Sequence, residues 1–471
     1  MLTVGTVLAA LADGVAVQGG PAGQPLAFGT HDSRAAGPDS LFVAFAGESS
    51  DGHDYVGQAF AAGAQVALVD RPVGDFPVVD MRGQQPVATL PELPFLIQVD
   101  DTMAGLQRIA GHYRRQFDVR VVGITGSVGK TTTKELVYSV MAQQGPTLKS
   151  QGNFNNEIGL PLTLLQLRDT HQTVVLEMGM YAIGEIALLC EIAQPQIGVV
   201  TNIAPVHLSR LGTIENIVTA KRELVEALPV DGVAILNQDD ERVLSMASAS
   251  RARVFTYGLA PEADLWADNI ESMGLDGIRC TLHYQGEQLT IQVPLIGRHS
   301  VHTVLRATAV GLVTGMTWDE IIRGLQSQQA QLRLVTVAGP QGSIIIDDSY
   351  NASPESVIAA LNLLADLDGR RLAVLGDMLE LGDEEVRGHH LVGRRAAAVV
   401  QELVVVGERA RLIGEAAIDG GLRPAQVHFI DEAPAALPLL RELIQPADFV
   451  LVKGSLGMRM DRIVTELRED S

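Results

Sequence analysis

The sequence predicts an α/β protein of three domains, with residues 1–99, 100–332 and 333–471 in separate units. The length of 471 residues suits about three domains of ordinary size. Short apolar runs alternate with helical patterns through most of the chain, and such alternation is typical of parallel sheets covered by helices. We expect a small N-terminal α/β domain, a central parallel-sheet domain with a small antiparallel insert, and a C-terminal Rossmann-like domain.

The N-terminal range contains the elements of a small α/β domain. Phe42–Phe45 and Ala64–Val69 are apolar runs that we interpret as strands, and Tyr55–Ala62 has the pattern of a helix between them. Five prolines fall between Pro72 and Pro94, and proline lacks the backbone donor that a central strand needs. This segment is therefore predicted to form an edge strand and a linker.

The central range combines a parallel sheet with one antiparallel hairpin. Asp100–Gln116 has the periodicity of an amphipathic helix, and it leads into the apolar run Val119–Ile124. Ile278–Val293 alternates between apolar and polar residues around Gly286, which predicts a hairpin. Three more buried strands are expected, at 173–176, 197–200 and 232–236.

The C-terminal range repeats a strand followed by a helix, which is the pattern of a Rossmann-like domain. It lacks the glycine fingerprint of dinucleotide-binding domains, so we expect no bound NAD. The expected strands lie at 344–346, 372–375, 403–406, 427–430 and 449–452.

Composition narrows the possible partners and the location of the protein. The formal net charge of -21 repels nucleic acid and anionic membranes, so neither is an expected partner. The two cysteines, Cys190 and Cys280, are too few for a disulfide framework or a metal knuckle. The N-terminus lacks the features of a signal peptide, and no apolar run of about 18 residues predicts a membrane span. We therefore expect a cytoplasmic protein, in which a phosphorylated substrate must meet a local positive patch.

A phosphate-binding loop is predicted between the apolar run Val119–Ile124 and the helical pattern Lys134–Met141. Glycines let the backbone curl so that its N–H groups converge on an anion, and the helix N-terminus adds partial positive charge. Lys130 can reach the terminal phosphates of a nucleoside triphosphate, and the Thr131 hydroxyl can bind Mg²⁺. An ordinary Gly/Ser turn is the structural alternative. The loop residues are Gly126, Ser127, Val128, Gly129, Lys130, Thr131 and Thr132.

Three other side chains are candidates for the same site. Glu177 comes directly after a predicted strand, where a carboxylate can bind Mg²⁺; the alternative is a carboxylate that caps a helix or faces solvent. His207 also follows a predicted strand, although a lone histidine is more often packed or exposed than a ligand. Lys221 lies on a helical stretch, where the residues alone indicate a solvated lysine.

Two further segments have the character of binding loops. Asn153, Asn155 and Asn156 are three asparagines within four residues, which disfavours a regular element and suits a loop that offers donors and acceptors. An asparagine-rich turn without a ligand is the alternative. The segment 346–354 follows another predicted strand, and Asp348 within it can accept hydrogen bonds from a ribose.

The phosphate loop is shorter than the common P-loop and resembles that of the Mur ligase superfamily. The common form would have glycine at the position of Ile124. Mur ligases are ATP-dependent amide-forming enzymes of bacterial cell-wall synthesis, and the resemblance extends in order over nearly the whole chain. It implies a UDP-sugar-binding domain, a central ATP-binding domain and a C-terminal ligase domain. The ATP contacts that it implies are Gly126, Ser127, Gly129, Lys130, Thr131, Thr132, His299, Arg333 and Asp348.

The resemblance also implies a metal site with two Mg²⁺ ions. In the family, the lysine that matches Lys221 is carbamylated by CO₂, which converts a cation into a carboxylate-like group. The implied metal ligands are Thr131, Glu177, His207 and Lys221, and the implied catalytic residues are Lys130, Glu177, His207 and Lys221.

The resemblance is most specific in the asparagine-rich loop and in the segment 346–354. Both are similar to those of Mur ligases that join D-Ala-D-Ala to a UDP-N-acetylmuramoyl tripeptide through an acyl phosphate, so these two molecules and ATP are the expected substrates. Ser33 and Arg34 are then expected to contact the uridine diphosphate. The family also suggests a monomer. The other expected substrate contacts are Asn153, Asn155, Asn156, Tyr350, Asn351 and Lys453.

One departure from the family pattern lies near the expected adenine site. The family usually has asparagine at two positions where this chain has Ser300 and Thr303. The alternatives to the leading interpretation are a sister ligase that adds another amino acid, a nucleotide-binding switch, and an inactive binding protein. The asparagine-rich loop argues against a sister ligase, and the sequence lacks the guanine-reading Asn-Lys-x-Asp of a GTPase.

Overall fold

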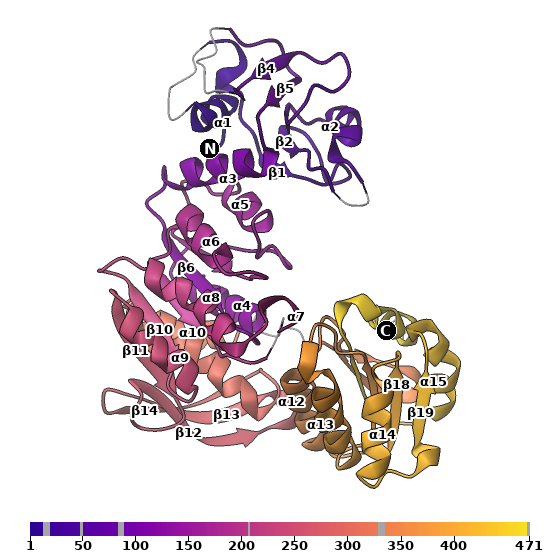
Figure 1. Ribbon diagram of the computed structural model, residues 1–471. Helices are drawn as coiled ribbons and strands as arrows, with labels where there is room; N and C mark the ends of the chain where they lie inside the picture. Colours follow the sequence, from indigo (N-terminus) through magenta and orange to yellow (C-terminus); the bar gives the residue numbers. More distant parts are fainter. Residues whose placement is uncertain (13–18, 48–49, 83–88, 206–207, 328–334, 469–471) are drawn as a thin grey trace.

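The computed structural model describes residues 1–12, 19–47, 50–82, 89–205, 208–327 and 335–468. Three sheets, each with its own helices, follow one another along the chain (Figure 1). The sheet of the N-terminal residues lies at one end of the molecule, and the C-terminal sheet lies beside the central one. This arrangement confirms the predicted α/β class with three domains.

The first sheet contains five parallel strands in the order β1-β2-β3-β5-β4. The predicted strands correspond to β2 (Ser40–Val43) and β3 (Val66–Val69), and the predicted helix corresponds to α2 (Val56–Ala61). The proline-rich segment contributes the edge strand β4 (Val78–Asp80), because an edge strand needs fewer backbone donors. The other elements are β1 (Phe28–Thr30), β5 (Phe95–Gln98) and α1 (Val4–Leu11).

Helix α3 (Thr102–Arg114) joins the first sheet to the second. It begins after Asp101, whose carboxylate accepts hydrogen bonds from two backbone N–H groups of the first turn. The helix packs against α1 on one side and against α5 (Gly159–Leu164) and α6 (Glu185–Ala193) on the other. One hydrophobic core therefore continues from the first sheet to one face of the second.

The second sheet has nine strands in the order β14-β13-β12-β11-β10-β9-β6-β8-β7. Neighbouring strands run parallel from β7 to β12, whereas β12, β13 and β14 pair in antiparallel fashion. The predicted hairpin is present with Gly286 at its turn, and it extends this same sheet. The strands are β6 (Arg120–Thr125), β7 (Thr147–Lys149), β8 (Thr173–Glu177), β9 (Ile197–Val200), β10 (Val233–Asn237), β11 (Arg253–Gly258), β12 (Leu265–Ser272), β13 (Ile278–Tyr284) and β14 (Glu287–Val293).

Helices cover both faces of the second sheet. Helices α4 (Lys130–Met141), α10 (Val301–Val313) and α11 (Trp318–Leu325) pack together over one face. Helices α6 and α8 (Ile214–Ala227) cover the other face together with α3. Helix α4 begins four residues before the predicted pattern, because the phosphate loop ends directly in its first turn. Two short helices, α7 (Leu208–Leu211) and α9 (Glu241–Ser245), complete this domain.

The third sheet has six strands in the order β15-β16-β20-β17-β18-β19, and only the edge strand β15 runs antiparallel to its neighbour. All five predicted strands are present. They are β16 (Ile344–Asp348), β17 (Arg371–Gly376), β18 (Glu402–Val406), β19 (Val427–Ile430) and β20 (Phe449–Lys453), and β15 spans Val335–Ala338. Helices α12 (Pro354–Ala365), α13 (Glu385–Ala397) and α14 (Arg411–Asp419) cover one face, and α15 (Leu437–Leu443) and α16 (Asp461–Leu467) cover the other.

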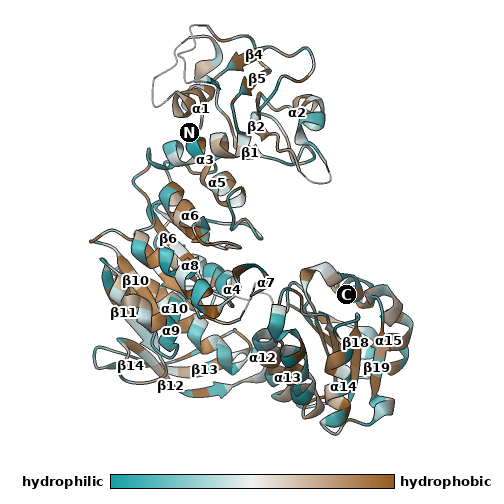
Figure 2. Cartoon of the chain, in the orientation of Figure 1, coloured by the Kyte–Doolittle hydropathy of each residue, from teal (hydrophilic) through white to brown (hydrophobic). Residues whose placement is uncertain are grey.

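The pattern of hydropathy follows these layers. In Figure 2 the strands are mainly brown, and the outward faces of many helices are teal. Parallel strands that are buried on both faces have nearly continuous apolar sequences, as in β18 and β20. Among the described residues, no helix has the combined length and apolar character needed to cross a bilayer.

Candidate active site

A cavity of about 960 Å³ lies between the second and third sheets. Its walls come from the loops that follow β6, β8 and β9 of the central sheet and from segments that follow β16 and β20. Carboxyl ends of parallel strands are where ligands bind in open α/β sheets. Fifteen predicted site residues line it: Ser127, Gly129, Lys130, Thr131, Thr132, Asn153, Asn155, Asn156, Glu177, Lys221, His299, Asp348, Tyr350, Asn351 and Lys453.

Two glycines give the phosphate loop its shape. Gly126 has φ +141°, and a Cβ atom there would lie 1.8 Å from Oγ1 of Thr201. Gly129 has φ +82° and is the N-cap of α4. Residues with a side chain rarely adopt these angles, so the turn from β6 into α4 requires glycine at both positions. The loop thereby presents its backbone at the N-terminus of a helix, where an anion is favoured.

The segment after β9 holds the phosphate loop in place. Oδ1 of Asn202 accepts a hydrogen bond of 2.9 Å from the backbone N–H of Val128. The Ser127 hydroxyl donates to the carbonyl of Ala204 at 3.0 Å and accepts from its N–H at 2.9 Å. Asn202 was not among the predicted site residues, although its position directly after a strand was a usable signal. Asn202 lies outside the phosphate loop and holds it in place through this hydrogen bond.

Lys130 bends back over the loop that precedes it. Its Nζ donates to the carbonyl of Gly126 at 2.9 Å and to that of Ser127 at 3.3 Å. The ammonium group therefore lies beside the loop and at the wall of the cavity. The reach of Lys130 toward the phosphates of a nucleotide stays a prediction.

Glu177 is the centre of a buried polar cluster. The residue is 3% exposed, and its Oε2 accepts a hydrogen bond of 2.6 Å from the Thr131 hydroxyl. Its Oε1 accepts one of 2.9 Å from Nδ2 of Asn155, and its backbone N–H donates to the hydroxyl of Ser150. The structure thus excludes the alternative of a solvated carboxylate and joins the phosphate loop to the asparagine-rich loop.

Lys134 is a buried cation that the sequence analysis missed. It is fully buried, and its Nζ lies 3.9 Å from Oε2 of Glu177 and 3.3 Å from Oε1 of Glu135. It also donates to the carbonyl of Gly152, at 3.3 Å. Lys134 lies one helical turn after Lys130 on the same helix, and this spacing could have predicted from sequence that it lies beside the site.

Lys221 is buried at 2% exposure, although it lies on the helix α8. The residue pattern alone indicated a solvated lysine, and the structure contradicts that interpretation. Burial, and then the nearby charge of Lys130, lower the pKa of Lys221 well below its ordinary value. The uncharged amine is therefore favoured far more than at a surface lysine.

The three asparagines of the asparagine-rich loop make different contacts. The side-chain amide of Asn155 donates to Glu177, and its backbone carbonyl accepts a hydrogen bond of 2.8 Å from the N–H of Gly179. Oδ1 of Asn156 accepts from the N–H of Gly159 at 2.9 Å, at the start of α5. Asn153 is exposed in the cavity.

The third domain contributes a charged pair to the opposite wall. Lys453 ends β20 and is 2% exposed, and its Nζ lies 2.7 Å from Oδ2 of Asp348 at the end of β16. The two residues are register partners in the sheet. Nζ also donates to the carbonyl of Asn351 at 2.7 Å. Tyr350 is exposed, so this wall combines a fixed ion pair with an accessible aromatic ring.

Ser300 and Thr303, which replace the two asparagines of the family pattern, lie in the region where the adenine is expected. The Ser300 hydroxyl donates to the carbonyl of Ile296 at 2.8 Å, and buried Thr303 lines the cavity. Nε2 of His302 lies 2.8 Å from Oδ2 of Asp239. Polar groups therefore remain at this end of the cavity.

Arg306 is a second buried cation that the sequence analysis missed. It lies on α10, one turn after Thr303, and its guanidinium is near the phosphate loop. Nε donates to the hydroxyl of Tyr257 at 2.8 Å, and Nη1 donates to that of Thr133 at 2.9 Å.

Five predicted residues are not among those that line this cavity: Gly126, which belongs to the phosphate loop, and Ser33, Arg34, His207 and Arg333. Ser33 and Arg34 belong to the first domain: the Ser33 hydroxyl donates to Gln58, and exposed Arg34 pairs with Asp32 at 2.8 Å. The Arg34 guanidinium lowers the pKa of Asp32 to about 2. His207 and Arg333 lie outside the described residues. Within the part of the chain that the structure describes, no group of three or more His, Cys, Asp or Glu could hold a metal ion.

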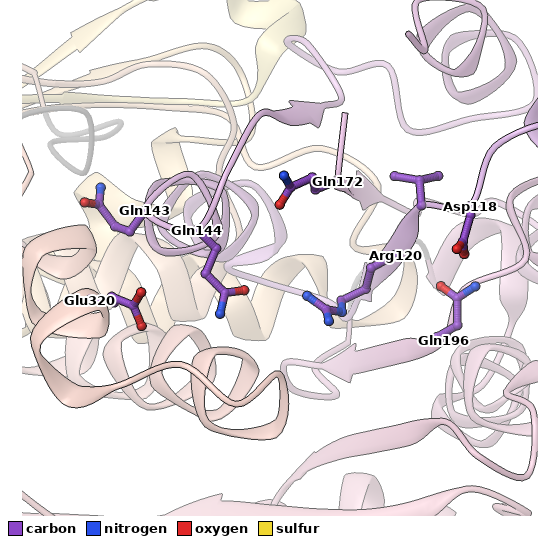
Figure 3. Close-up of a pocket in the computed structure, with 8 residues that line it drawn as sticks. Asp118, Arg120, Gln143, Gln144, Gln172, Gln196 and Glu320 are labelled. Atoms are coloured by element: carbon purple, nitrogen blue, oxygen red, sulfur yellow. The ribbon is translucent and has the colours of Figure 1, made fainter. Parts of the chain in front are cut away.

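A second cavity, of about 750 Å³, lies at the amino ends of the central strands (Figure 3). Four glutamines, Arg120, Asp118, Val119 and Glu320 line it. It contains none of the predicted site residues and lies at the edge of the sheet opposite to the phosphate loop. We assign it no part in the chemistry.

Comparison with known families and relatives identifies the family of the chain. Three family descriptions match the chain in order. Residues 25–114 match the "Mur ligase family, catalytic domain", and residues 124–311 match the "Mur ligase middle domain". Residues 332–456 match the "Mur ligase, glutamate ligase domain". A Bacillus subtilis relative named UDP-N-acetylmuramoyl-tripeptide--D-alanyl-D-alanine ligase is 36% identical, over 93% of this chain and 92% of the relative. An Escherichia coli relative with the same name is 36% identical, over 94% and 93%.

Solved structures agree with this result. The crystal structure of MurF from Acinetobacter baumannii has a TM-score of 0.82 and 31% identity, over 98% of both chains. MurF ligase from Thermotoga maritima in complex with ADP has a TM-score of 0.75 and 25% identity, over 93% of this chain and 96% of that chain. With three matching domains in order and relatives of more than 30% identity over most of its length, the chain belongs to the Mur ligase family.

Proposed function

We propose that this protein is an ATP-dependent peptide ligase that joins D-Ala-D-Ala to a UDP-N-acetylmuramoyl tripeptide. The product would be the UDP-N-acetylmuramoyl pentapeptide used for peptidoglycan synthesis. One structural observation carries the proposal: the Thr131–Glu177–Asn155 cluster faces the Asp348–Lys453 pair across a single cavity. A phosphate loop, an asparagine-rich loop and a third-domain wall thus meet at one place, and the relatives named above have this activity in their names.

The phosphate loop and α4 would hold the phosphates of ATP. Backbone N–H groups of the loop and the helix N-terminus favour the anion, and Lys130 would move from the loop carbonyls to the phosphates. Its charge matters most when the phosphoryl group is transferred, because negative charge then spreads over the phosphoryl oxygens. We propose Gly126, Ser127, Gly129, Thr132, His299, Arg333 and Asp348 as the other ATP contacts.

The residues present fit a magnesium ion beside the phosphates. The Thr131 hydroxyl and the Glu177 carboxylate are hard oxygen donors 2.6 Å apart, and Mg²⁺ commonly takes one or two protein oxygens together with substrate phosphates. When bound, the ion would offset charge on the transferring phosphoryl group. Lys134 lies close enough to Glu177 to steady the carboxylate in this position.

Lys221 is proposed to be carbamylated and to complete a second magnesium site with His207. Attack of the uncharged amine on CO₂ forms a N–C bond and releases one proton, which leaves a carboxylate-like group. The observation that supports this is geometric: an almost fully buried lysine lines the cavity, where an ammonium group would be poorly solvated. A carbamate there would have the charge and the oxygen atoms that a second ion requires.

The reaction would proceed through an acyl phosphate. The terminal carboxylate of the tripeptide attacks the γ-phosphorus of ATP, and ADP leaves. The amine of D-Ala-D-Ala then attacks the acyl carbon, and phosphate leaves from the tetrahedral intermediate after the amine loses a proton. An acyl phosphate hydrolyses readily, so the central and third domains would have to close around it and exclude water.

The remaining substrate contacts are proposed from the position of each loop. Ser33 and Arg34 of the first domain would hold the uridine diphosphate. Asn153, Asn155 and Asn156 would face the tripeptide, while Tyr350, Asn351 and Lys453 would face the incoming D-Ala-D-Ala. Lys453 would meet the substrate while it remains paired with Asp348.

We also propose domain boundaries near residues 99 and 332, and a monomer that acts in the cytoplasm. Each of the three sheets is built from strands within one of the ranges 1–99, 100–332 and 333–471. Helix α3 follows the first boundary but packs on both neighbouring domains, so it would be the element through which their orientation is set.

Phosphate release tests the function directly. The purified protein is incubated with ATP, Mg²⁺ and UDP-N-acetylmuramoyl tripeptides that end in lysine or in diaminopimelate. Phosphate and pentapeptide should form only when D-Ala-D-Ala is added. A product with a single amino acid instead of D-Ala-D-Ala would favour a sister ligase, and nucleotide binding without any amide product would contradict the proposal.

A further inference from the structure

Arg306 is a buried arginine that abuts the phosphate loop from helix α10. The residue is 5% exposed, and its guanidinium donates to the hydroxyls of Tyr257 and Thr133, at 2.8 and 2.9 Å. Nη1 also lies 3.3 Å from the point that a Cβ atom at Gly129 would occupy. The guanidinium therefore reaches the N-cap of α4, where the loop meets the helix.

Within the described ranges, no carboxylate matches the charge of Arg306, whose guanidinium lies 5.6 Å from the ring centroid of Tyr257. Both hydrogen-bond partners are neutral hydroxyl groups, and within the described ranges no carboxylate forms an ion pair with this guanidinium. A buried cation without an anion is costly, and proteins normally pair such groups. The two hydrogen bonds do not require a positive charge, and one contact of 5.6 Å with the Tyr257 ring offsets the cost of a buried cation only in part.

Arg306 is also open to the site, because it lines the cavity together with Lys130 and Lys453. The cavity also contains the carboxylates Glu177, Glu185, Asp348, Glu355 and Glu380, so the positive charge is local to the phosphate loop, where Lys130 and Arg306 lie. Two cations at this loop attract an anion against the field of a chain whose net charge is -21.

We propose that Arg306 is a nucleotide-binding residue whose guanidinium pairs with the phosphate chain of ATP beneath the phosphate loop. This inference rests on the proposed function and adds a residue to its nucleotide site. A guanidinium has five N–H groups, and the two hydroxyl contacts use two of them, so others remain for phosphate oxygens. The Tyr257 and Thr133 hydroxyls hold its plane in place before the nucleotide arrives.

Direct binding of ADP to the full-length protein, measured by calorimetry, tests this proposal without requiring turnover. Arg306→Met removes the charge and keeps most of the volume, whereas Arg306→Lys keeps the charge. Arg298→Met is the matched control, because Arg298 is an exposed arginine of the preceding turn that does not line the cavity. Tyr257→Phe is a comparison variant, which removes one anchor of the guanidinium and leaves its charge.

We expect Arg306→Met to weaken ADP binding at least ~10-fold and to make it less sensitive to salt, because a charge–charge contact is lost. Arg306→Lys should retain part of the affinity, Tyr257→Phe should lose less affinity than Arg306→Met, and Arg298→Met should bind ADP within about threefold of the parent protein. Unchanged affinity and salt dependence in Arg306→Met would overturn the inference. The inference would also be overturned if Arg306→Met and Tyr257→Phe lost ADP affinity to the same extent and lost thermal stability to the same extent. Arg306 would then only hold α10 in place. Failure of the parent protein to bind ADP would instead refute the proposed function.

Discussion

The hydroxyl of Thr131 and the carboxylate of Glu177 are joined by a hydrogen bond of 2.6 Å, although they lie 46 positions apart in the sequence. Thr131 is in the first turn of α4, and Glu177 ends β8. The two meet because β6 and β8 are adjacent parallel strands, whose carboxyl ends share one edge of the sheet. This adjacency brings two oxygen donors to the place where a nucleotide-bound metal ion is expected.

Lys130→Ala should abolish turnover and preserve the fold. The loop is shaped by Gly126 and Gly129 and held by Asn202, so it does not depend on the lysine side chain. The lost charge matters most in the transition state, and kcat should fall by at least ~10³. Steady-state kinetics and circular dichroism of the same preparation measure both effects. A variant with near-normal kcat would refute the proposed phosphate site.

Arg34→Ala should raise KM for the UDP-sugar peptide and leave KM for ATP nearly unchanged. Arg34 is an exposed residue of the first domain and does not line the cavity that contains the phosphate loop. Arg82→Ala is a matched control, because Arg82 makes the same kind of exposed pair, with Asp80, in that domain. Equal effects of Arg34→Ala on both substrates would contradict the division of substrates between domains.

Lys221→Ala should be nearly inactive and should still bind ATP. The change removes the proposed carbamate, and short carboxylic acids should partly restore activity by filling the vacated space. Depletion of CO₂ should also slow the parent enzyme. Kinetics with added formate or acetate, together with mass spectrometry of the intact site, measure these effects. An active Lys221→Ala variant, or a bare lysine in a crystal with nucleotide and magnesium, would disprove carbamylation.

The third domain should lose stability in mild acid through His389. This residue is fully buried; its Nε2 accepts from the N–H of Met378 at 3.2 Å, and its ring meets the carbonyl of Glu385 at 2.7 Å. Burial lowers the pKa of His389 below its ordinary value of 6.5. The unfolded chain therefore takes up a proton below pH 6.5 before the folded chain does, so stability falls as the pH falls, by at most ~1.4 kcal/mol per pH unit.

Thermal unfolding at pH 7.5 and 5.5 measures this effect. His389→Gln should show a smaller loss of Tm between the two pH values than the parent protein does. His390→Gln is the neighbouring control, because His390 is partly exposed, and it should behave like the parent. The same loss of Tm in all three proteins would show that groups other than His389 cause the loss of stability in acid.

The alternation of apolar runs and helical patterns was sufficient to predict the three α/β domains and most strands. This succeeded because strands such as β9 and β18 are buried on both faces, and burial of that kind demands a nearly continuous apolar sequence. The phosphate loop was also evident from sequence, because Gly126 and Gly129 have backbone angles that other residues rarely adopt.

Only the tertiary structure decided which distant side chains share the site. Lys134 and Lys221 both lie on helices, and local sequence does not show how deeply a helix face is covered. Both are buried: Lys221 lies in the cavity wall, and Lys134 lies behind it. Arg306 likewise meets the phosphate loop only because α10 packs across α4. Residue type and periodicity are local properties, whereas burial and charge pairing depend on which strands are neighbours, and that order is set by the packing of the whole domain.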